Sequence, residues 1–352
     1  MRIALICPSN MLFMPYVKNY EQILIDNEIN YEIINWDRFH IEETSNNKYK
    51  DGKIGHQRNY FEYLKYRKFV LTRLKSIQYD KVIIFGIQMA YFLKSILINN
   101  YKGRYVIDIR DHNKILHLFN IKGLIECSEF TVLSSSGFKE WLPNSRNFII
   151  NHNTLISNLN ELKQVRNNVM SNEKINIAYI GAQRDLVINI DFINSVKNNK
   201  KISLYFNGVG AINNDIEAYL KENTVSNVYV TGRYDKEDEE SLYEKNDVIN
   251  VLRYNDGLNN KTALPNRLYN AVLYAKPLLA FEGSYLAEQV TSYNLGMVIS
   301  SFDDFEQQIS DYLNQFDINK YNKGRELFLS KVIEDNFFFK NSLIKFINHE
   351  YR

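Results

Sequence analysis

Two segments of the chain carry side chains whose types and spacing could do chemistry. The first, residues 259–280, reads N-N-K-T-A-L-P-N-R-L-Y-N-A-V-L-Y-A-K-P-L-L-A. Its polar start holds Asn259, Asn260 and Lys261, and a proline-started helical pattern and a short apolar run follow. Because the first N–H groups of a helix attract anions, this junction predicts a site for a phosphorylated ligand. An ordinary structural junction is the alternative.

The second segment, R-Y-V-I-D-I-R-D-H over residues 104–112, places Asp111 and His112 just beyond an apolar run. A carboxylate beside an imidazole can act as a general base, and a histidine can stabilise positive charge that develops on a substrate. We therefore take Asp111 and His112 as catalytic candidates. The alternative is that Asp111 caps a helix and that His112 lies at the surface.

Rigid elements must position these residues, and the apolar pattern predicts two sets of alternating strands and helices. In the first half we expect helices near 17–27, 58–77 and 89–99, and strands at 2–7, 31–35, 81–86, 104–109, 130–133 and 148–151. In the second half we expect strands at 175–180, 202–207, 228–231, 248–252, 278–281 and 296–299. Alternation of this kind is typical of a parallel sheet with helices on both faces. The sequence thus predicts an α/β protein with two doubly wound, Rossmann-like domains facing each other across a cleft.

The length of 352 residues, with 45% hydrophobic and 24% charged residues, fits two folded domains of ordinary size. A polar stretch over 153–174 separates the two sets of elements. We expect an acceptor-side domain over 1–154, a ligand-binding domain over 155–335, and a C-terminal helix over 336–352 that crosses back to the first domain.

The charge is distributed unevenly along the chain. Residues 1–154 hold 21 Lys and Arg against 15 Asp and Glu, a net charge near +6, and the remainder holds 22 against 26, near −4. A basic first half favours an anionic membrane surface or a phosphorylated partner, and an uneven solvated surface is the alternative. The helical pattern over 58–75, basic and aromatic, could lie on a membrane, although Leu64, Leu71 and Leu74 favour a core-facing helix. No basic block resembles a nucleic-acid-binding arm.

The two cysteines, Cys7 and Cys127, suggest no disulfide framework, and a reducing cytoplasm fits. The apolar run at the start is too short for a signal peptide, and no apolar run reaches the ~18 residues of a spanning helix. We expect a cytoplasmic protein whose membrane contact is peripheral.

Three further strand ends in the second half carry glycine, and two of them also carry arginine. Gly181 follows one strand, with Arg184 three residues later, and Gly232-Arg233 ends another. Gly181 could let the backbone approach a phosphate whose charge Arg184 neutralises, and the backbone at Gly232-Arg233 could read the edge of a nucleobase. Between them, L-Y-F-N-G-V-G over 204–210 lacks the third glycine of a dinucleotide fingerprint, which argues against a nicotinamide or flavin cofactor.

The order of these motifs resembles the nucleotide-sugar-binding half of GT-B glycosyltransferases. It is particularly similar to enzymes around glycosyltransferase family 4 that build bacterial capsular and O-antigen polysaccharides. The resemblance covers the second half of the chain. It is carried by the glycines at 181, 208, 210 and 232, by Y-E-K-N-D over 243–247, by P-N-R-L-Y-N-A over 265–271, and by A-K-P-L-L-A over 275–280.

One departure from the family pattern concerns catalysis. Family 4 enzymes carry two glutamates separated by seven residues, and aligning 265–271 with that pattern puts Thr262 and Asn270 at the two positions. Asn270 can hydrogen-bond a ribose hydroxyl, but a charge-assisted contact becomes a neutral one. The resemblance therefore implies donor binding and leaves open whether transfer is retaining or inverting.

The resemblance implies a hexosyltransferase-like enzyme that moves a sugar from a nucleotide-diphosphate donor to a glycan or lipid-linked oligosaccharide acceptor at the inner face of the plasma membrane. Asp111 and His112 would serve catalysis. The donor-binding candidates are Gly181, Arg184, Gly232, Arg233, Asn259, Asn260, Lys261, Asn266 and Asn270. No D-x-D-like acidic pair follows a strand, so we expect neither a cofactor nor an obligatory metal.

Two alternatives remain open from the sequence. Non-hydrolysing nucleotide-sugar epimerases share the two-domain architecture but need several acidic and basic groups around one sugar. A degenerate GT-B protein that binds a partner or glycan without catalysis is the other alternative, and the missing glutamate pair favours it.

Overall fold

The computed structural model describes residues 1–165 and 174–349. The chain divides into two compact units, which we call unit 1 (Met1–Asn153 and Glu334–Arg352) and unit 2 (Thr154–Ile333). Within the polar stretch 153–174, residues 166–173 lie outside the described residues, as do residues 350–352 of the expected C-terminal helix.

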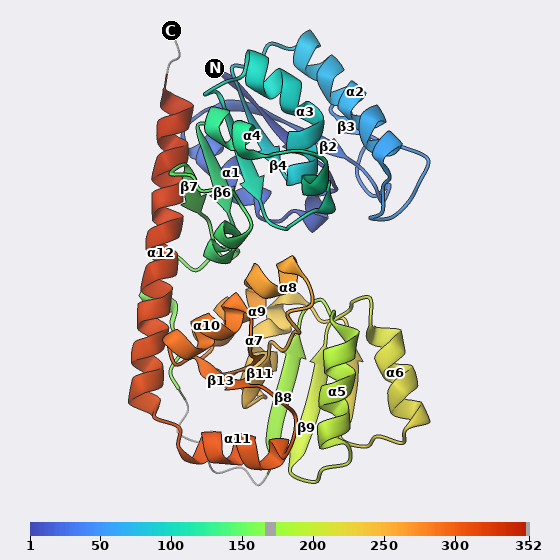
Figure 1. The fold of residues 1–352 in the computed structure, drawn as a ribbon, viewed down its shortest axis with the longest axis vertical. Helices are drawn as coiled ribbons and strands as arrows, with labels where there is room; N and C mark the ends of the chain where they lie inside the picture. Colours follow the sequence, from blue (N-terminus) through green and yellow to red (C-terminus); the bar gives the residue numbers. More distant parts are fainter. Residues whose placement is uncertain (166–173, 350–352) are drawn as a thin grey trace. The chain divides into compact units, whose positions relative to one another are not determined.

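Unit 1 is built on a parallel sheet whose described strands run in the order β3-β2-β1-β4-β5-β6-β7 (Figure 1). They are β1 (Arg2–Cys7), β2 (Asn30–Trp36), β3 (Lys48–Tyr49), β4 (Lys81–Phe85), β5 (Tyr105–Ile109), β6 (Phe130–Leu133) and β7 (Phe148–Ile150). Their near-continuous apolar runs match a sheet buried on both faces. The short edge strand β3 carries too little apolar signal to be predicted from the sequence.

Along the chain, the helices of unit 1 connect these strands. They are the 3₁₀ helix η1 (Met11–Phe13), α1 (Val17–Asp26), α2 (Tyr60–Ser76), α3 (Ile87–Asn100), the 3₁₀ helix η2 (Lys114–Leu118), α4 (Lys122–Cys127) and the 3₁₀ helix η3 (Ser136–Glu140).

Helix α2 packs one face against the sheet, as the core-facing reading predicted. A capping box between Asn59 and Glu62 starts the helix. Its buried stripe consists of Tyr63, Tyr66, Val70 and Leu74, so Leu74 belongs to that stripe while the other two expected leucines are only half-buried. The predicted core face is correct, but two of its four buried residues are tyrosines.

Unit 2 has its own parallel sheet, with its described strands in the order β10-β9-β8-β11-β12-β13. They are β8 (Ile175–Ile180), β9 (Ile202–Asn207), β10 (Val228–Gly232), β11 (Val248–Asn250), β12 (Leu278–Phe281) and β13 (Gly296–Ile299). The two parallel sheets confirm the predicted α/β class with two Rossmann-like domains.

The helices of unit 2 cover both faces of its sheet. They are η4 (Leu159–Glu161), α5 (Leu186–Val196), α6 (Asn213–Glu222), η6 (Lys236–Asp238), α7 (Glu239–Glu244), α8 (Leu258–Thr262), α9 (Asn266–Leu273), α10 (Tyr285–Ser292) and α11 (Phe305–Asn314). In Figure 1, helices α5 and α6 lie next to β8 and β9.

The segment 259–280 differs locally from its prediction. Asn259 to Lys261, expected in a loop, lie in the short helix α8. Pro265 is the cap that precedes α9 and not its first turn, and α9 ends at Leu273 because Ala275 adopts a positive φ of 57°. Proline suits both positions, since its missing N–H is unneeded at either one.

The last helix, α12 (Ile318–Asn348), carries residues of both units. The C-terminal helix was expected to begin near residue 336, and it begins 18 residues earlier. In unit 2, the buried Arg325 donates from Nε to the Val272 carbonyl (2.8 Å). In unit 1, the buried ammonium of Lys81 donates to the carbonyls of Phe346 and His349, the latter at 2.7 Å. Cationic donors thus fasten the helix within each unit.

Candidate functional site

The carboxyl ends of parallel strands share one edge of a sheet, so the loops after β8, β9, β10 and β11 meet at one edge of unit 2. From β8 the strand order runs one way to β9 and β10 and the other way to β11, β12 and β13. The strand order therefore reverses between β8 and β11, and the loops after these two strands diverge there. We call this place the reversal point. In doubly wound folds, ligands bind at this point.

The loops after β8 and β9 are pressed together by glycines. A Cβ at position 208 would lie 2.2 Å from the Gly181 carbonyl oxygen, and one at position 210 would lie 2.0 Å from the Gln183 carbonyl oxygen. Gly181 and Gly208 also have φ values of 113° and 128°. Any larger residue at 208 or 210 would push these loops apart, so the glycines fix the geometry of this edge.

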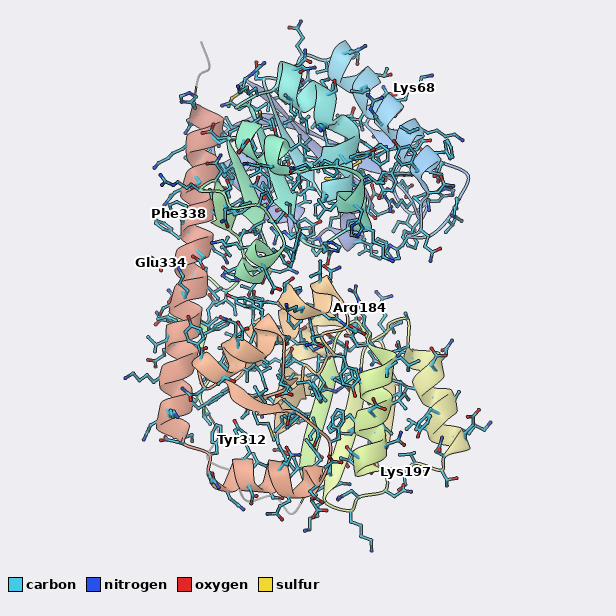
Figure 2. All side chains as sticks on the ribbon, viewed as in Figure 1. Lys68, Arg184, Lys197, Tyr312, Glu334 and Phe338 are labelled. Atoms are coloured by element: carbon cyan, nitrogen blue, oxygen red, sulfur yellow. The ribbon has the colours of Figure 1, made fainter. Side chains whose placement is uncertain are left out.

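Arg184 is exposed at this edge of unit 2, whereas Lys197, which follows the far end of α5, lies at the opposite edge (Figure 2). The backbone N–H of Arg184 donates to the Tyr179 hydroxyl (3.0 Å). The carbonyl of Arg184 accepts from the buried Asn189 amide (3.0 Å), and Asn189 accepts in turn from Asn250 on β11 (3.1 Å). A buried amide pair thus ties the loop after β8 to β11.

Asn260, from helix α8, contacts the loop after β8 and forms with it the polar cluster Arg184, Asp185, Asp256 and Asn260. Its amide donates to Asp185 Oδ1 (3.1 Å) and to Asp256 Oδ1 (3.0 Å). The structure therefore brings Asn260 together with the segment that carries Arg184. Asp185 itself has φ 62°, so this loop turns sharply before α5 begins.

Two buried arginines lie beside this cluster, and neither was predicted. Arg253 follows β11, and Arg267 lies in the first turn of α9; both are 8% exposed. The Arg267 guanidinium lies 3.5 Å from the centre of the Tyr179 ring, and Nε of each arginine is buried without a hydrogen-bond partner among the described residues. Burial and then the charge of Arg267 lower the pKa of Arg253 to about 10, and Asp185 opposes this shift only in part.

These two arginines form a cationic site of the kind that an anion completes. Burying a guanidinium without a carboxylate partner is unfavourable, and a bound anion would supply the missing acceptors. The signal that could have located them is positional, because Arg253 lies three residues after the end of buried β11 and Arg267 lies two residues after the cap of α9. Sequence reasoning instead selected Arg184, Arg233 and Lys261 as the basic residues of the donor site.

The remaining predicted donor residues have different environments. Lys261 and Asn259 lie on α8, Asn266 is exposed at the start of α9, and Asn270 is half-buried one turn further along. Thr262, aligned with the first family glutamate, is buried and donates to the Leu258 carbonyl.

Gly232 and Arg233 lie at the end of β10, on the outer side of β9. Gly232 has φ 74°, and its carbonyl accepts from the Gly208 N–H (2.7 Å). Arg233 is exposed. Two strands separate β10 from β11, so the structure groups Arg233 with the outer loops and not with the buried arginines.

In unit 1, the polar residues at the end of β5 divide into two groups. Asp108 is fully buried and accepts two hydrogen bonds from Arg110 (2.6 and 2.8 Å) and one from the Tyr20 hydroxyl (2.6 Å). Arg110 also donates to the Asn151 carbonyl (2.9 Å). This network is fully paired, so it holds β5, α1 and the end of β7 together.

Asp111 and His112 project beyond that network. Asp111 is exposed and His112 is half-buried, with its ring packed edge-on against Trp141 at 5.2 Å between centroids. Burial, followed by the charge of His117, lowers the pKa of His112. The following 3₁₀ helix η2 is capped by Asn113, so Asp111 does not serve as its cap. His112 is thus held neutral near physiological pH, which suits a proton acceptor.

Two other polar segments of unit 1 have structural roles. The Ser135 hydroxyl caps η3 by accepting from the Gly137 N–H (3.1 Å). His152 is buried; its backbone N–H donates to Asn336 Oδ1 (2.8 Å), and its ring Nε2 lies 3.2 Å from Asp335 Oδ2 on α12.

Within residues 1–165 and 174–349, no cluster of three or more His, Cys, Asp or Glu side chains could hold a metal ion. The same described part of the chain contains no helix that is both long and apolar enough to span a bilayer.

Comparisons with known proteins relate the chain to others through structure alone. No protein-family model matches the sequence, and neither does any curated protein. Among solved structures, a sucrose-phosphate synthase from Thermosynechococcus elongatus is similar with a TM-score of 0.68 at 13% identity, covering 98% of this chain and 97% of that one. WaaG, described as a glycosyltransferase involved in lipopolysaccharide biosynthesis, has a TM-score of 0.64 at 13% identity, covering 99% and 100%. The chain has the GT-B fold.

A third structure with this fold is Anabaena HepE in complex with UDP and glucose. Its TM-score is 0.61 at 11% identity, with 98% of this chain and 100% of that chain covered. The match to the GT-B fold extends over almost the whole chain, whereas the sequence motifs covered only its second half. The GT-B fold expected from the sequence is therefore confirmed.

Proposed function

We propose that the protein is a glycosyltransferase whose unit 2 binds a nucleotide-diphosphate sugar. The buried pair Arg253 and Arg267 supports this proposal most directly, because two buried guanidinium groups with unpartnered Nε atoms at the reversal point of a GT-B sheet favour a multiply charged anion. A diphosphate supplies several acceptor oxygens in one group. The UDP complex of HepE, a protein of the same fold, is consistent with this ligand class.

The same residues would assist the chemical step. As the bond between the anomeric carbon and the diphosphate breaks, negative charge builds up on the leaving oxygen. Fixed guanidinium groups in a site shielded from water stabilise that charge strongly. Arg253 and Arg267 would supply the fixed charge, while Arg184 and Lys261, nearer the solvent, would neutralise the outer phosphate oxygens.

The nucleoside would be held by neutral groups. Asn270 is half-buried on α9, and we assign it the ribose hydroxyls. Thr262 points its hydroxyl at the α8 backbone, so a side-chain carboxylate is missing from that position. We leave the stereochemistry of transfer undetermined on this ground.

On the acceptor side we assign general-base catalysis to His112, with Asp111 beside it. The lowered pKa keeps the imidazole unprotonated, so it can accept a proton from an acceptor hydroxyl as that oxygen attacks. We propose a glycan or lipid-linked oligosaccharide as acceptor and a role in bacterial surface polysaccharide synthesis at the cytoplasmic membrane face. The positive charge of the first half supports peripheral contact with anionic lipid.

Donor binding can be tested by titrating the full-length protein with UDP in a calorimeter. Arg253→Gln and Arg267→Gln should each weaken binding by about 10- to 100-fold, as expected for a lost charge-assisted hydrogen bond. Lys261→Ala should have a smaller effect. Lys197→Gln, at the opposite edge of the unit, is the matched control and should bind like the wild type. Wild-type affinity in both arginine variants would remove the proposed site.

Catalysis is tested separately by measuring sugar transfer with a panel of nucleotide sugars. His112→Ala and Asp111→Ala should reduce turnover by about 100-fold or more while UDP affinity stays nearly unchanged. Full activity in both variants would show that the catalytic assignment is wrong. Tight UDP binding without turnover of any donor would instead favour a binding protein, the alternative that the side chains at 262 and 270 support.

A further inference from the structure

Helix α7 of unit 2 carries a carboxylate on its buried face, and no step of the proposed reaction uses it. Glu239 begins this helix and is 8% exposed, and Tyr243, one turn later, is fully buried. Residues four apart lie on the same face of a helix, so Glu239 lies on the core side of α7. An apolar residue is expected at such a position, because burying a carboxylate lowers stability.

Glu239 lies at the edge of unit 2 where the donor is proposed to bind. Helix α7 leads from the end of β10 to the start of β11, and α9 leads from the segment after β11 to the start of β12. Because all these strands are parallel, the first residues of both helices lie at the carboxyl ends of the strands. Tyr243 belongs to the same core cluster as Leu268 and Ala271 of α9, so the two helices pack together.

Two tyrosines connect Glu239 with the residues of α9. The Tyr234 hydroxyl donates to Glu239 Oε1 over 3.4 Å. Burial, and then the charge of Glu239, raise the pKa of both Tyr234 and Tyr243, and the charge of Arg267 opposes both shifts. Asn270 lowers the pKa of Tyr243 as well, although no hydrogen bond of ordinary length joins the two side chains. Glu239, Arg267 and Asn270 therefore surround the same tyrosine hydroxyl.

The contacts of Glu239 leave part of its capacity to accept hydrogen bonds unused. Oε2 accepts from the ammonium of Lys236, a side chain that is 78% exposed. A pair with so exposed a lysine adds little to stability, so a ligand can displace the lysine at small cost. The contact of Oε1 with Tyr234 is long, and a carboxylate has about four acceptor positions. The Glu239 side chain keeps 11% exposure and is open to a donor that approaches from the edge.

The chemistry of this position fits a vicinal diol. A carboxylate repels phosphate, so its ligand is a neutral part of the nucleotide. Asn270 lies about one helical turn beyond Arg267, which places both Asn270 and Glu239 beside the group next to the diphosphate, the ribose. Two adjacent hydroxyls can donate to one carboxylate, and such charge-assisted hydrogen bonds are about twice as strong as neutral ones.

We propose that Glu239 binds the 2′,3′-diol of the donor's ribose, together with Asn270. This role rests on the proposed function, because it requires the diphosphate to lie at Arg253 and Arg267. Helix α7 then supplies the carboxylate that α9 lacks at position 270. In the free protein Lys236 is the counter-ion of this carboxylate, and it turns to solvent when the ribose binds.

The test compares UDP with 2′,3′-dideoxy-UDP by calorimetry on the full-length protein. The wild type should bind UDP at least about tenfold more tightly than the dideoxy analogue. In Glu239→Met this preference should fall to about twofold, the part that the neutral Asn270 supplies. Affinity for the dideoxy analogue should not fall, because a negative charge near the diphosphate is removed. Glu240→Gln is the matched control, since its ion pair with Lys163 is exposed, and it should keep the full preference.

Two further variants separate ribose recognition from a structural ion pair. Glu239→Gln keeps the shape and one neutral acceptor, so its preference for UDP should lie between those of the wild type and Glu239→Met. Lys236→Gln removes only the counter-ion and should keep the full preference. Glu239→Met should be at least as stable to denaturant as the wild type, because an apolar side chain suits the buried face of α7.

The outcomes distinguish this role from the donor site itself. UDP binding with an unchanged preference in Glu239→Met, or with no preference in the wild type, would overturn the role of Glu239 and leave the donor site standing. Equal loss of preference in Lys236→Gln and Glu239→Gln would overturn it in the same way. A wild type that does not bind UDP would refute the donor site and this role together.

Discussion

At the scale of single residues, the buried arginines support the proposed donor site more directly than the exposed basic residues do. Arg184 and Lys261 stand in polar sequence surroundings, which is the pattern that sequence reasoning searches for. Arg253 follows Val251-Leu252, and Arg267 precedes Leu268-Tyr269. A basic residue beside such an apolar pair is typical of the exposed face of a strand or helix. Only the packing of Arg267 on Tyr179, and the missing partners of both Nε atoms, point to the anion site that we propose.

His112 provides a prediction at the same scale. Its pKa is lowered first by burial and second by His117, so His117→Asn should raise the pKa of His112 toward its ordinary value of about 6.5 but not reach it. His117 is exposed, and the variant should fold. Titration of the His112 ring proton by NMR measures this shift, and an unchanged or lower pKa would contradict the contact.

The sign of the linked stability effect follows from the same shift. Because the folded state disfavours protonated His112, stability is greatest above the unfolded pKa of about 6.5 and falls as the pH drops through the lower folded value. In the proposed reaction, the acidic limb of kcat/KM should likewise lie below pH 6.5. That limb should be missing in His112→Ala.

At the scale of elements, apolar periodicity located nearly every strand, since parallel strands buried on both faces are continuous apolar runs. It failed where tertiary contacts decide the local structure. Asn259 to Lys261 form a helical turn because Gly257 starts it and Asn260 is held to Asp185 and Asp256. No propensity of N-N-K predicts those partners.

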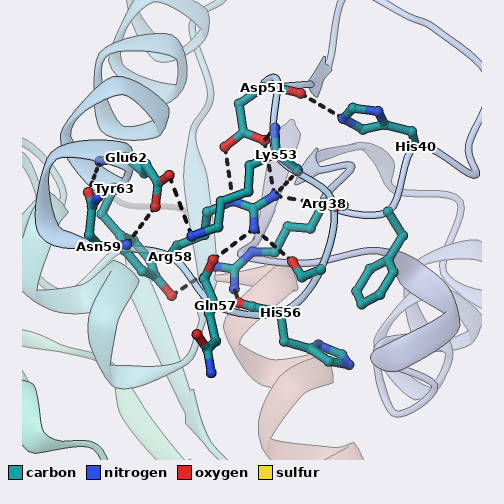
Figure 3. Close-up of polar contacts among 12 residues, drawn as sticks. Arg38, His40, Asp51, Lys53, His56, Gln57, Arg58, Asn59, Glu62 and Tyr63 are labelled. Carbon is teal, nitrogen blue, oxygen red and sulfur yellow. Dashed lines mark hydrogen bonds and ion pairs between the residues drawn. The ribbon is translucent and has the colours of Figure 1, made fainter.

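The loop between β3 and α2 gives a prediction about an element. Arg58→Gln removes the bidentate contact of this buried guanidinium with Asp51 and its bonds to loop carbonyls (Figure 3), so it should lower the free energy of unfolding by about 2–3 kcal/mol. Lys53→Gln is a matched control, since its ion pair with Glu62 is exposed and long at 3.9 Å. That control should cost less than about 1 kcal/mol.

Denaturant unfolding and amide exchange over residues 50–58 measure both effects. Faster exchange should be confined to this loop and to η1, which His56 contacts. If Arg58→Gln were as stable as Lys53→Gln, the buried guanidinium would not organise the loop.

At the scale of the whole molecule, the sequence predicted two Rossmann-like domains and the GT-B fold correctly, because alternating apolar runs and glycines at strand ends can be recognised in a single sequence. It underestimated α12, whose start at Ile318 lies in a polar, helix-neutral stretch. The helix extends that far because packing supports it: a Cβ at Gly324 would lie 1.7 Å from the Tyr293 carbonyl oxygen. Such close approach is invisible to periodicity.

The attachment of α12 to unit 1 can be weakened at one residue. Lys81→Met removes the ammonium that caps the last carbonyls of the helix, and it should destabilise unit 1 by about 2–3 kcal/mol. Lys345→Met, an exposed lysine in the same last turn, is the control and should change stability by less than about 0.5 kcal/mol. Amide exchange at the end of α12 should quicken only in the first variant. Identical exchange in both would argue against the cap.

The position of α12 also sets the order in which the protein can be made. Phe339, Leu343, Phe346 and Ile347 belong to the same core cluster as Ile3 of the first strand. The ribosome therefore finishes all the residues of unit 2 before it supplies the last part of the core of unit 1. The half of the protein that is synthesised first must wait, with part of its apolar surface uncovered, until the final helix emerges.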